Sequence, residues 1–182
     1  MIDFEIPDDL ASLRDEIRQF VIEKIVPYER DPRVTRHGPN EREAGLLTFQ
    51  APRRFGGREP SHREQAVLFE AAGWSTLGPV ALNCAAPDEG NMYLLGKIAT
   101  DKQVEEFLMP VIDGRQRSGF AMTEPGGAGS DPNQLATEAV YDGTDYVING
   151  RKWLITGANG ARTWIIMARV APNEHGADGR CR

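Results

Sequence analysis

Cysteine is scarce in this sequence, since only Cys84 and Cys181 occur among its 182 residues. Two cysteines are too few for a disulfide framework, which indicates a reducing compartment. The three histidines, at positions 37, 62 and 175, are scattered without the spacing of metal ligands. We therefore expect neither a disulfide-stapled fold nor a structural zinc site.

A long apolar run is also lacking. The longest apolar stretch, near Trp164–Ala168, is far too short to span a bilayer. The N-terminus carries Asp3, Glu5, Asp8 and Asp9, where a secretory signal has a basic start and a transit peptide has few acids. The sequence therefore predicts a cytoplasmic protein with no membrane partner.

An excess of positive charge is missing as well. Lys and Arg number 21 against 27 Asp and Glu, so the net charge is −6. Nucleic-acid binding needs a clustered basic face and is not expected. Glycines and Glu59 interrupt the stretch that holds Arg53, Arg54 and Arg58, which we interpret as a solvated loop. With 40% hydrophobic and 26% charged residues, the composition is that of a globular protein.

Helical periodicity dominates the sequence up to about residue 117. Apolar residues at helical spacing over 10–25 predict a helix that Pro27 ends. Capping-box patterns, Ser61 with Glu64 and Thr100 with Gln103, predict two more helix starts. The first of these helices is expected to run to residue 73, and the second to close at 113–114. An Ala- and Leu-rich stretch over 78–96 predicts a further helix between them.

Beyond residue 117 the apolar period changes to two. This alternation predicts strands over 119–123, 136–141, 146–149, 152–156 and 163–170. Asp142–Gly143 and Asn149–Gly150 are turn signals, because both dipeptides tolerate positive φ. Helices followed by strands predict an α+β fold. We expect an all-α helical domain over 1–117 and a partial antiparallel β-barrel or sandwich domain over 118–182.

The last stretch of the sequence, 171–182, is polar and rich in turn-forming residues. A set of strands that stopped there would leave unpaired edges, and such edges promote aggregation. We therefore expect either that something covers these edges or that the chain is a fragment of a longer protein.

A glycine-rich loop over Phe120–Asp131 is the most informative feature. A predicted strand leads through Met122 and Thr123 into a loop with three glycines and a proline. Its backbone N–H groups and the hydroxyls of Thr123 and Ser130 suit a phosphate or a polar heterocycle. From the residues alone, a turn without a ligand is equally open, because the pattern is neither a Walker loop nor a dinucleotide fingerprint.

Four ordered stretches resemble signature segments of the acyl-CoA dehydrogenase family. They are the loop 51–57, the lead-in 108–114, the glycine-rich loop 120–131 and the segment 145–157, and together they span most of the chain. The resemblance implies FAD as cofactor and an acyl-CoA thioester as substrate. It further implies α,β-dehydrogenation with hydride transfer to the flavin, and a homo-oligomer in full-length members.

By position, the resemblance also assigns site residues. The pyrimidine edge and pyrophosphate of the flavin are expected to contact Phe120, Met122, Thr123, Gly129 and Ser130. Leu154 takes the place of the aromatic ring that lies against the flavin, and Thr156 supplies a hydroxyl near its N5 atom. Ser130 is also expected near the carrier arm of the thioester. Glu124 is interpreted as part of the loop framework and not as a base.

Two departures from the family pattern bear on flavin binding. The glycine-rich loop is one residue longer than the commonest form, and Leu154 stands where the family usually has Trp, with Trp153 shifted by one. One step along a strand reverses the face of a side chain, so we expect that Trp153 does not replace the missing ring. The lost stacking costs about 0.5–1.5 kcal/mol, up to roughly tenfold in affinity, which predicts weak or no flavin retention.

No residue of the chain matches the catalytic base of the family, which lies in a C-terminal helical bundle. No catalytic residue is therefore assigned, and the chain alone is not expected to oxidise acyl-CoA. Two alternatives stay open. One is a non-catalytic helical interaction module derived from the family, which has no reason to assemble Thr123, Ser130 and Thr156. The other is a relative of the acyl-CoA oxidases or nitroalkane oxidases.

Overall fold

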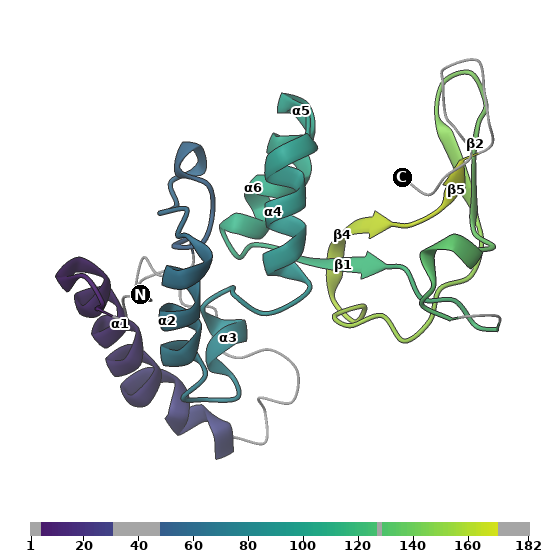
Figure 1. The fold of residues 1–182 in the computed structure, drawn as a ribbon. Coiled ribbons are helices and arrows are strands. Elements are labelled where there is room, and N and C mark those ends of the chain that lie inside the picture. The colour runs from purple at the N-terminus through teal and green to yellow at the C-terminus, as the bar shows by residue number, and fades with distance from the viewer. Residues whose placement is uncertain (1–4, 31–47, 127–128, 171–182) are drawn as a thin grey trace. The chain divides into compact units, whose positions relative to one another are not determined.

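The computed structural model describes residues 5–30, 48–126 and 129–170. Two of the three histidines, Cys181 and the polar stretch 171–182 lie outside these ranges. The chain divides into two compact units, Met1–Gln116 and Arg117–Arg182. Helices come first and strands follow, as the α+β prediction requires (Figure 1). None of the described helices combines the length and the apolar character needed to span a bilayer.

Helix α1 (Asp8–Phe20) carries the predicted apolar stripe into the core. Pro7 precedes it, and a π-helical turn (Val21–Ile25) and a 3-10 turn (Val26–Arg30) continue it past Phe20. Regular α-helical hydrogen bonding therefore ends at Phe20, about two turns before Pro27. The fully or nearly buried side chains of this segment recur at helical spacing and are Leu10, Leu13, Ile17, Val21 and Ile25.

Both predicted capping boxes are formed. At the start of α2 (His62–Ala72), the Ser61 hydroxyl accepts the N–H of Glu64 at 3.4 Å, and the Glu64 carboxylate accepts the N–H of Ser61 at 2.6 Å. Thr100 and Gln103 form the same pair at α5 (Asp101–Gln103). A π-helical turn (Val104–Leu108) and α6 (Met109–Ile112) then complete that segment.

The single helix expected over 78–96 is wrong, because two helices occupy this stretch. Helix α3 (Gly78–Ala81) ends just before Asn83, whose φ of 57° is left-handed. Asn83 is buried, and its amide donates to the Val111 carbonyl at 2.9 Å. Helix α4 (Asp88–Ile98) starts only after Pro87. The Ala- and Leu-rich composition concealed these two helix-breaking positions.

The strand unit holds two small sheets with mixed pairing. β1 (Arg117–Ala121) and β4 (Ala161–Ile166) run parallel. β2 (Glu138–Tyr141) is antiparallel to β3 (Tyr146–Asn149) and parallel to β5 (Arg169–Val170). The expected antiparallel arrangement therefore holds for the β2–β3 hairpin alone among the described strands. Parallel neighbours need a long connection, and residues 122–160 provide it between β1 and β4.

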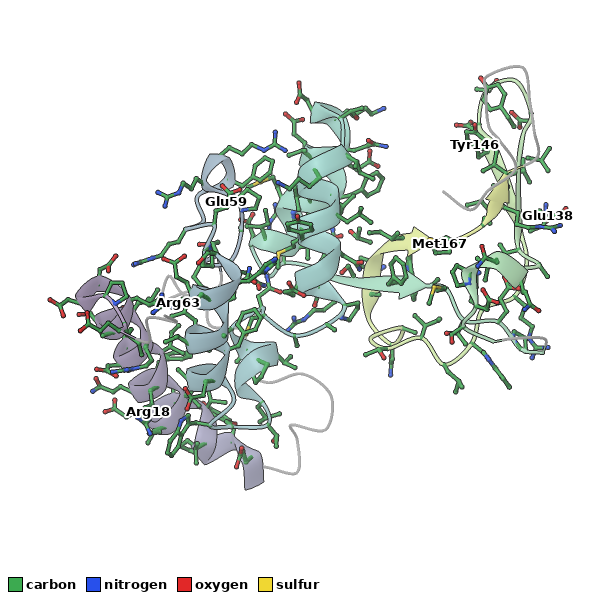
Figure 2. The ribbon with its side chains drawn as sticks, in the orientation of Figure 1. Arg18, Glu59, Arg63, Glu138, Tyr146 and Met167 are labelled. Atoms are coloured by element: carbon green, nitrogen blue, oxygen red, sulfur yellow. The ribbon has the colours of Figure 1, made fainter. Side chains whose placement is uncertain are left out.

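Two local contacts shape these sheets. A Cβ atom at Gly119 would lie 2.4 Å from the Trp164 ring, so the bare glycine lets that ring pack onto β1. The Asp142–Gly143 turn joins β2 to β3 as predicted, and the Asp142 carboxylate accepts two backbone N–H groups there at 2.9 Å. Tyr146 begins β3 beyond this turn, with its ring 5.3 Å from that of Tyr141 (Figure 2).

Candidate functional site

The glycine-rich loop leaves β1 at Ala121. Gly126 and Gly129 have φ values of 91° and 62°, a region that glycine occupies without strain. The N–H of Glu124 donates to the Gly129 carbonyl at 3.0 Å, which closes the loop. Beyond it, the Asp131 carboxylate accepts the Asn133 N–H at 2.9 Å and so caps a 3-10 turn (Pro132–Gln134). The loop is therefore fixed at both ends.

Glu124 is part of this loop, and its side chain is buried. One carboxylate oxygen accepts the Ala136 N–H at 2.6 Å. The other accepts the N–H of Thr137 at 2.9 Å, the Thr137 hydroxyl, and the ammonium of Lys152 at 2.8 Å. Burial alone would raise the pKa of Glu124, but the bonds from Lys152, Thr137 and Ala136 outweigh it and lower the pKa to about 2. The ionised, fully engaged carboxylate fits the framework role expected for Glu124.

Lys152 ties a second segment to the loop. Besides Glu124, its ammonium contacts the Met122 carbonyl at 2.9 Å, and the neighbouring Trp153 N–H donates to the Thr123 carbonyl at 3.1 Å. The strand predicted over 152–156 is wrong, because this stretch is irregular and Leu154 has a left-handed φ of 52°. The expected reversal of faces between Trp153 and Leu154 assumed a strand, so it does not apply here.

The predicted site residues differ in how far the structure brings them together. The carbonyls of Met122, Thr123 and Gly129 all accept hydrogen bonds in or beside the loop. Their donors are Lys152, Trp153 and Glu124, respectively. Phe120 is half-buried and lies in β1, one residue before the end of this strand. Leu154 directly follows Lys152 and Trp153, which bond to the loop, and its side chain is 82% exposed. Ser130 and Thr156 are also exposed.

Three residues of this arrangement were missed by sequence reasoning. Lys152 and Thr137 both bond to Glu124, from 28 and 13 positions along the chain. A Cβ atom at Gly150 would lie 2.2 Å from the Thr137 hydroxyl oxygen, so this glycine permits close packing. Gly150 does not form the hairpin turn that Asn149–Gly150 predicted, because its φ is not positive and no strand follows over 152–156. The one signal for Lys152 in the sequence was its place two residues after Gly150, and it does not identify the partner of the lysine.

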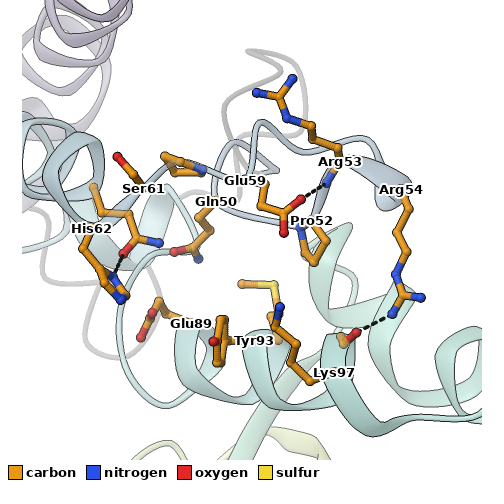
Figure 3. A pocket seen from close by; sticks show the side chains of 14 residues that line it. Gln50, Pro52, Arg53, Arg54, Glu59, Ser61, His62, Glu89, Tyr93 and Lys97 are labelled. Atoms are coloured by element: carbon orange, nitrogen blue, oxygen red, sulfur yellow. Dashed lines mark hydrogen bonds between the residues drawn. The ribbon is translucent and has the colours of Figure 1, made fainter.

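A separate hollow of about 820 Å³ lies in the helical unit, between the loop before α2 and the exposed side of α4 (Figure 3). None of the predicted site residues lines it. Its charges are largely balanced or already engaged. Arg54 donates to the Gly96 carbonyl, Lys97 lies 5.4 Å from the Tyr93 ring, and Glu59 accepts the Arg53 N–H at 3.3 Å. The hollow therefore shows no assembled catalytic group.

Within the described ranges, no group of three or more His, Cys, Asp or Glu side chains is placed to hold a metal ion. Cys84 is buried, and desolvation raises the pKa of its thiol to about 12, so the thiolate is not accessible near neutral pH.

The structure is that of an α+β protein whose strand unit carries a hydrogen-bonded, glycine-rich loop. The family model for the N-terminal domain of acyl-CoA dehydrogenases matches residues 7–115, and the model for their middle domain matches residues 119–181. The chain belongs to the acyl-CoA dehydrogenase family, which confirms the resemblance seen in its sequence.

Individual relatives agree with this assignment. FadE2 of Mycobacterium tuberculosis, named as a probable acyl-CoA dehydrogenase, is 49% identical over 113 residues, which are 60% of this chain and 28% of FadE2. YngJ of Bacillus subtilis, named in the same way, is 30% identical over 180 residues, 96% of this chain and 47% of YngJ. The chain thus spans less than half the length of these relatives.

A solved structure supports the fold. The complex of glutaryl-coenzyme A dehydrogenase with glutaryl-CoA superposes with a TM-score of 0.75 at 28% identity, over 92% of this chain and 44% of that one. The order of helical unit and strand unit is therefore that of a known acyl-CoA dehydrogenase.

Proposed function

We propose that this chain forms the FAD-binding loop of an enzyme that dehydrogenates an acyl-CoA thioester between its α and β carbons. The observation that carries the proposal is Leu154. Its side chain is 82% exposed and its backbone is left-handed, a conformation that leucine rarely adopts. Strained backbone is concentrated at functional sites, and the exposed side chain is available to contact a ligand. Leu154 also holds the family position that faces the flavin.

The residues of the loop fit the flavin in kind. A Cβ atom at Gly126 or Gly129 would meet nothing within 4 Å, so the loop is open to a ligand there. Its backbone N–H groups suit a pyrophosphate and a pyrimidine edge. We assign these contacts to a set on and beside the loop, namely Phe120, Met122, Thr123, Gly129 and Ser130. The bound FAD would supply the hydride acceptor.

Two further positions complete the proposed site. Leu154 would contact the flavin ring, and the hydroxyl of Thr156, which is exposed, would lie near N5. Ser130 would also lie near the carrier arm of the thioester. Because Leu154 offers no aromatic face, flavin binding is weak in this proposal.

The thioester as substrate class rests on two lines of support. The chain belongs to the acyl-CoA dehydrogenase family, and a structural relative holds glutaryl-CoA. Removal of the α-proton needs a carboxylate base. Glu124 does not serve as that base, because four bonds engage its oxygens and lower the pKa of the carboxyl to about 2, which makes it a poor proton acceptor. Homo-oligomeric assembly and a cytoplasmic location stay predictions.

Titration of the 182-residue chain with FAD tests the proposal. A ligand that binds only the folded state raises the free energy of unfolding and with it the melting temperature. At a ligand concentration of a hundred times Kd, the gain in free energy is about 2.7 kcal/mol. We expect a small rise that grows with the logarithm of the FAD concentration, together with a change in flavin fluorescence that saturates. An interaction module without a flavin site would show neither, and that result would contradict the proposal.

A further inference from the structure

The glycine-rich loop and segment 152–156 are held together without a strand ladder. Lys152 Nζ contacts both the Met122 carbonyl and the Glu124 carboxylate, and the Trp153 N–H contacts the Thr123 carbonyl. Three bonds therefore connect two irregular stretches separated by 28 positions in sequence. Each of these stretches carries residues of the proposed flavin site.

The connection is buried, which makes it rigid. The side chains of Lys152 and Glu124 are 12% and 9% exposed, and their charged groups are 2.8 Å apart. A buried ion pair with additional hydrogen bonds is shielded from competing water, and removing one partner leaves an unpaired charge. A small outward movement of either segment would break several bonds together.

A third segment supports the pair from behind. Ala136 and Thr137, just before β2, donate their backbone N–H groups to Glu124, and the Thr137 hydroxyl adds another bond. Thr137 in turn lies against the bare glycine at Gly150, where a Cβ atom would be only 2.2 Å away. Glu124 is thus held by the start of β2 and by the segment that follows β3.

We propose that Glu124 and Lys152 are positioning residues that fix the flavin-facing loop and segment 152–156 in their binding conformation before FAD arrives. The inference deepens the proposed function and rests on it. Neither side chain is assigned a contact with the flavin. They act through the backbone of Met122 and Thr123 on one side and through the placement of Leu154 on the other. Rigid preformed sites bind more tightly because less ordering remains to be done on binding.

The test compares FAD affinity with stability. We expect Lys152→Met to raise the Kd for FAD by about tenfold or more and to shift the visible absorption bands of bound flavin toward those of free flavin. Leu135→Ala serves as the matched control, since this buried side chain belongs to the same unit and makes no part of the ion pair. It should lower the melting temperature comparably while changing the Kd less than twofold. Equal effects of the two variants on the Kd would overturn the inference.

A milder variant guards against loss of folding. Thr137→Val keeps the buried volume and removes one bond to Glu124, so it should weaken FAD binding less than Lys152→Met but in the same direction. An unchanged Kd in a folded Thr137→Val chain, together with an unchanged Kd in Lys152→Met, counts against a positioning role.

Hydrogen exchange without FAD separates this inference from the proposed function. The Trp153 and Thr137 amides should exchange at least about tenfold faster in Lys152→Met than in the unsubstituted chain, because their acceptors are no longer held. Unchanged exchange would refute the preformed arrangement even if FAD binds. Faster exchange in a chain whose unsubstituted form binds no FAD would instead refute the proposed function and the role toward flavin with it.

Discussion

Acidification should destabilise the strand unit mainly through Glu124. The pKa of this carboxyl is about 2 in the folded chain, against an ordinary value of 4.5. A lowered folded-state pKa stabilises the fold above the unfolded value and loses that contribution as pH falls through the folded value. The pH window of the effect therefore runs from about 4.5 down to about 2.

The size of the effect follows from the shift. A difference of about 2.5 pKa units, 4.5 minus 2, corresponds to about 3 kcal/mol at neutral pH. By linkage, about 2 kcal/mol of this should be lost by pH 3. The side chain is 9% exposed, so water screens its interactions little. Such a loss is a large fraction of the stability of a small folded unit.

Urea unfolding at pH 6, 4 and 3 measures this loss. Trp153 and Trp164 report on the strand unit, and Trp74→Phe removes the one tryptophan of the helical unit. Glu124→Gln is the comparison, because it cannot titrate but leaves Asp131 and Asp142, whose pKa values are also lowered, in place. The unsubstituted chain should lose about 2 kcal/mol more than this variant between pH 6 and pH 3. Parallel losses in both chains would refute the reasoning.

Three further predictions concern single positions. Gly150→Ala should destabilise the strand unit by about 1–3 kcal/mol in urea unfolding, since its Cβ would press on Thr137. Gly90→Ala in α4 is the control and should stabilise by about 0.5–1 kcal/mol, because the space around Gly90 is open. Equal effects of the two substitutions would contradict the packing argument. Ser61→Ala should cost about 1 kcal/mol in thermal unfolding of the helical unit, and Ser61→Asp, which keeps a capping oxygen, should recover most of it. Leu154→Trp should raise FAD affinity by up to roughly tenfold in a fluorescence titration, and an unchanged Kd would place this side chain away from the flavin.

Features set by neighbouring residues could be predicted from the sequence. The capping boxes at Ser61 and Thr100 and the stripe of α1 depend on spacings of three and four, which the sequence displays directly. The Asp142–Gly143 turn is local for the same reason. The family pattern also located the glycine-rich loop, whose closing bond joins Glu124 to Gly129 only five positions away.

Features set by distant partners could not be predicted. Segment 152–156 alternates like a strand, but its backbone is held by Lys152 and Trp153 bonding to residues 122–124. The parallel pairing of β1 with β4 likewise depends on a partner beyond the intervening hairpin. Asn83 ends α3 because its buried amide finds carbonyls of α6, which no local pattern reveals.

The parallel β1–β4 pair sets an order of events for folding. Its partners are separated by the whole of 122–160, so the chain must close a long loop before the first bond of this pair forms. The β2–β3 hairpin inside that loop needs only its own short turn and can form early. Within the strand unit, the β2–β3 pairing should therefore form before the β1–β4 pairing. The proposed ligand-binding loop would then reach its final form late, when β4 docks against β1.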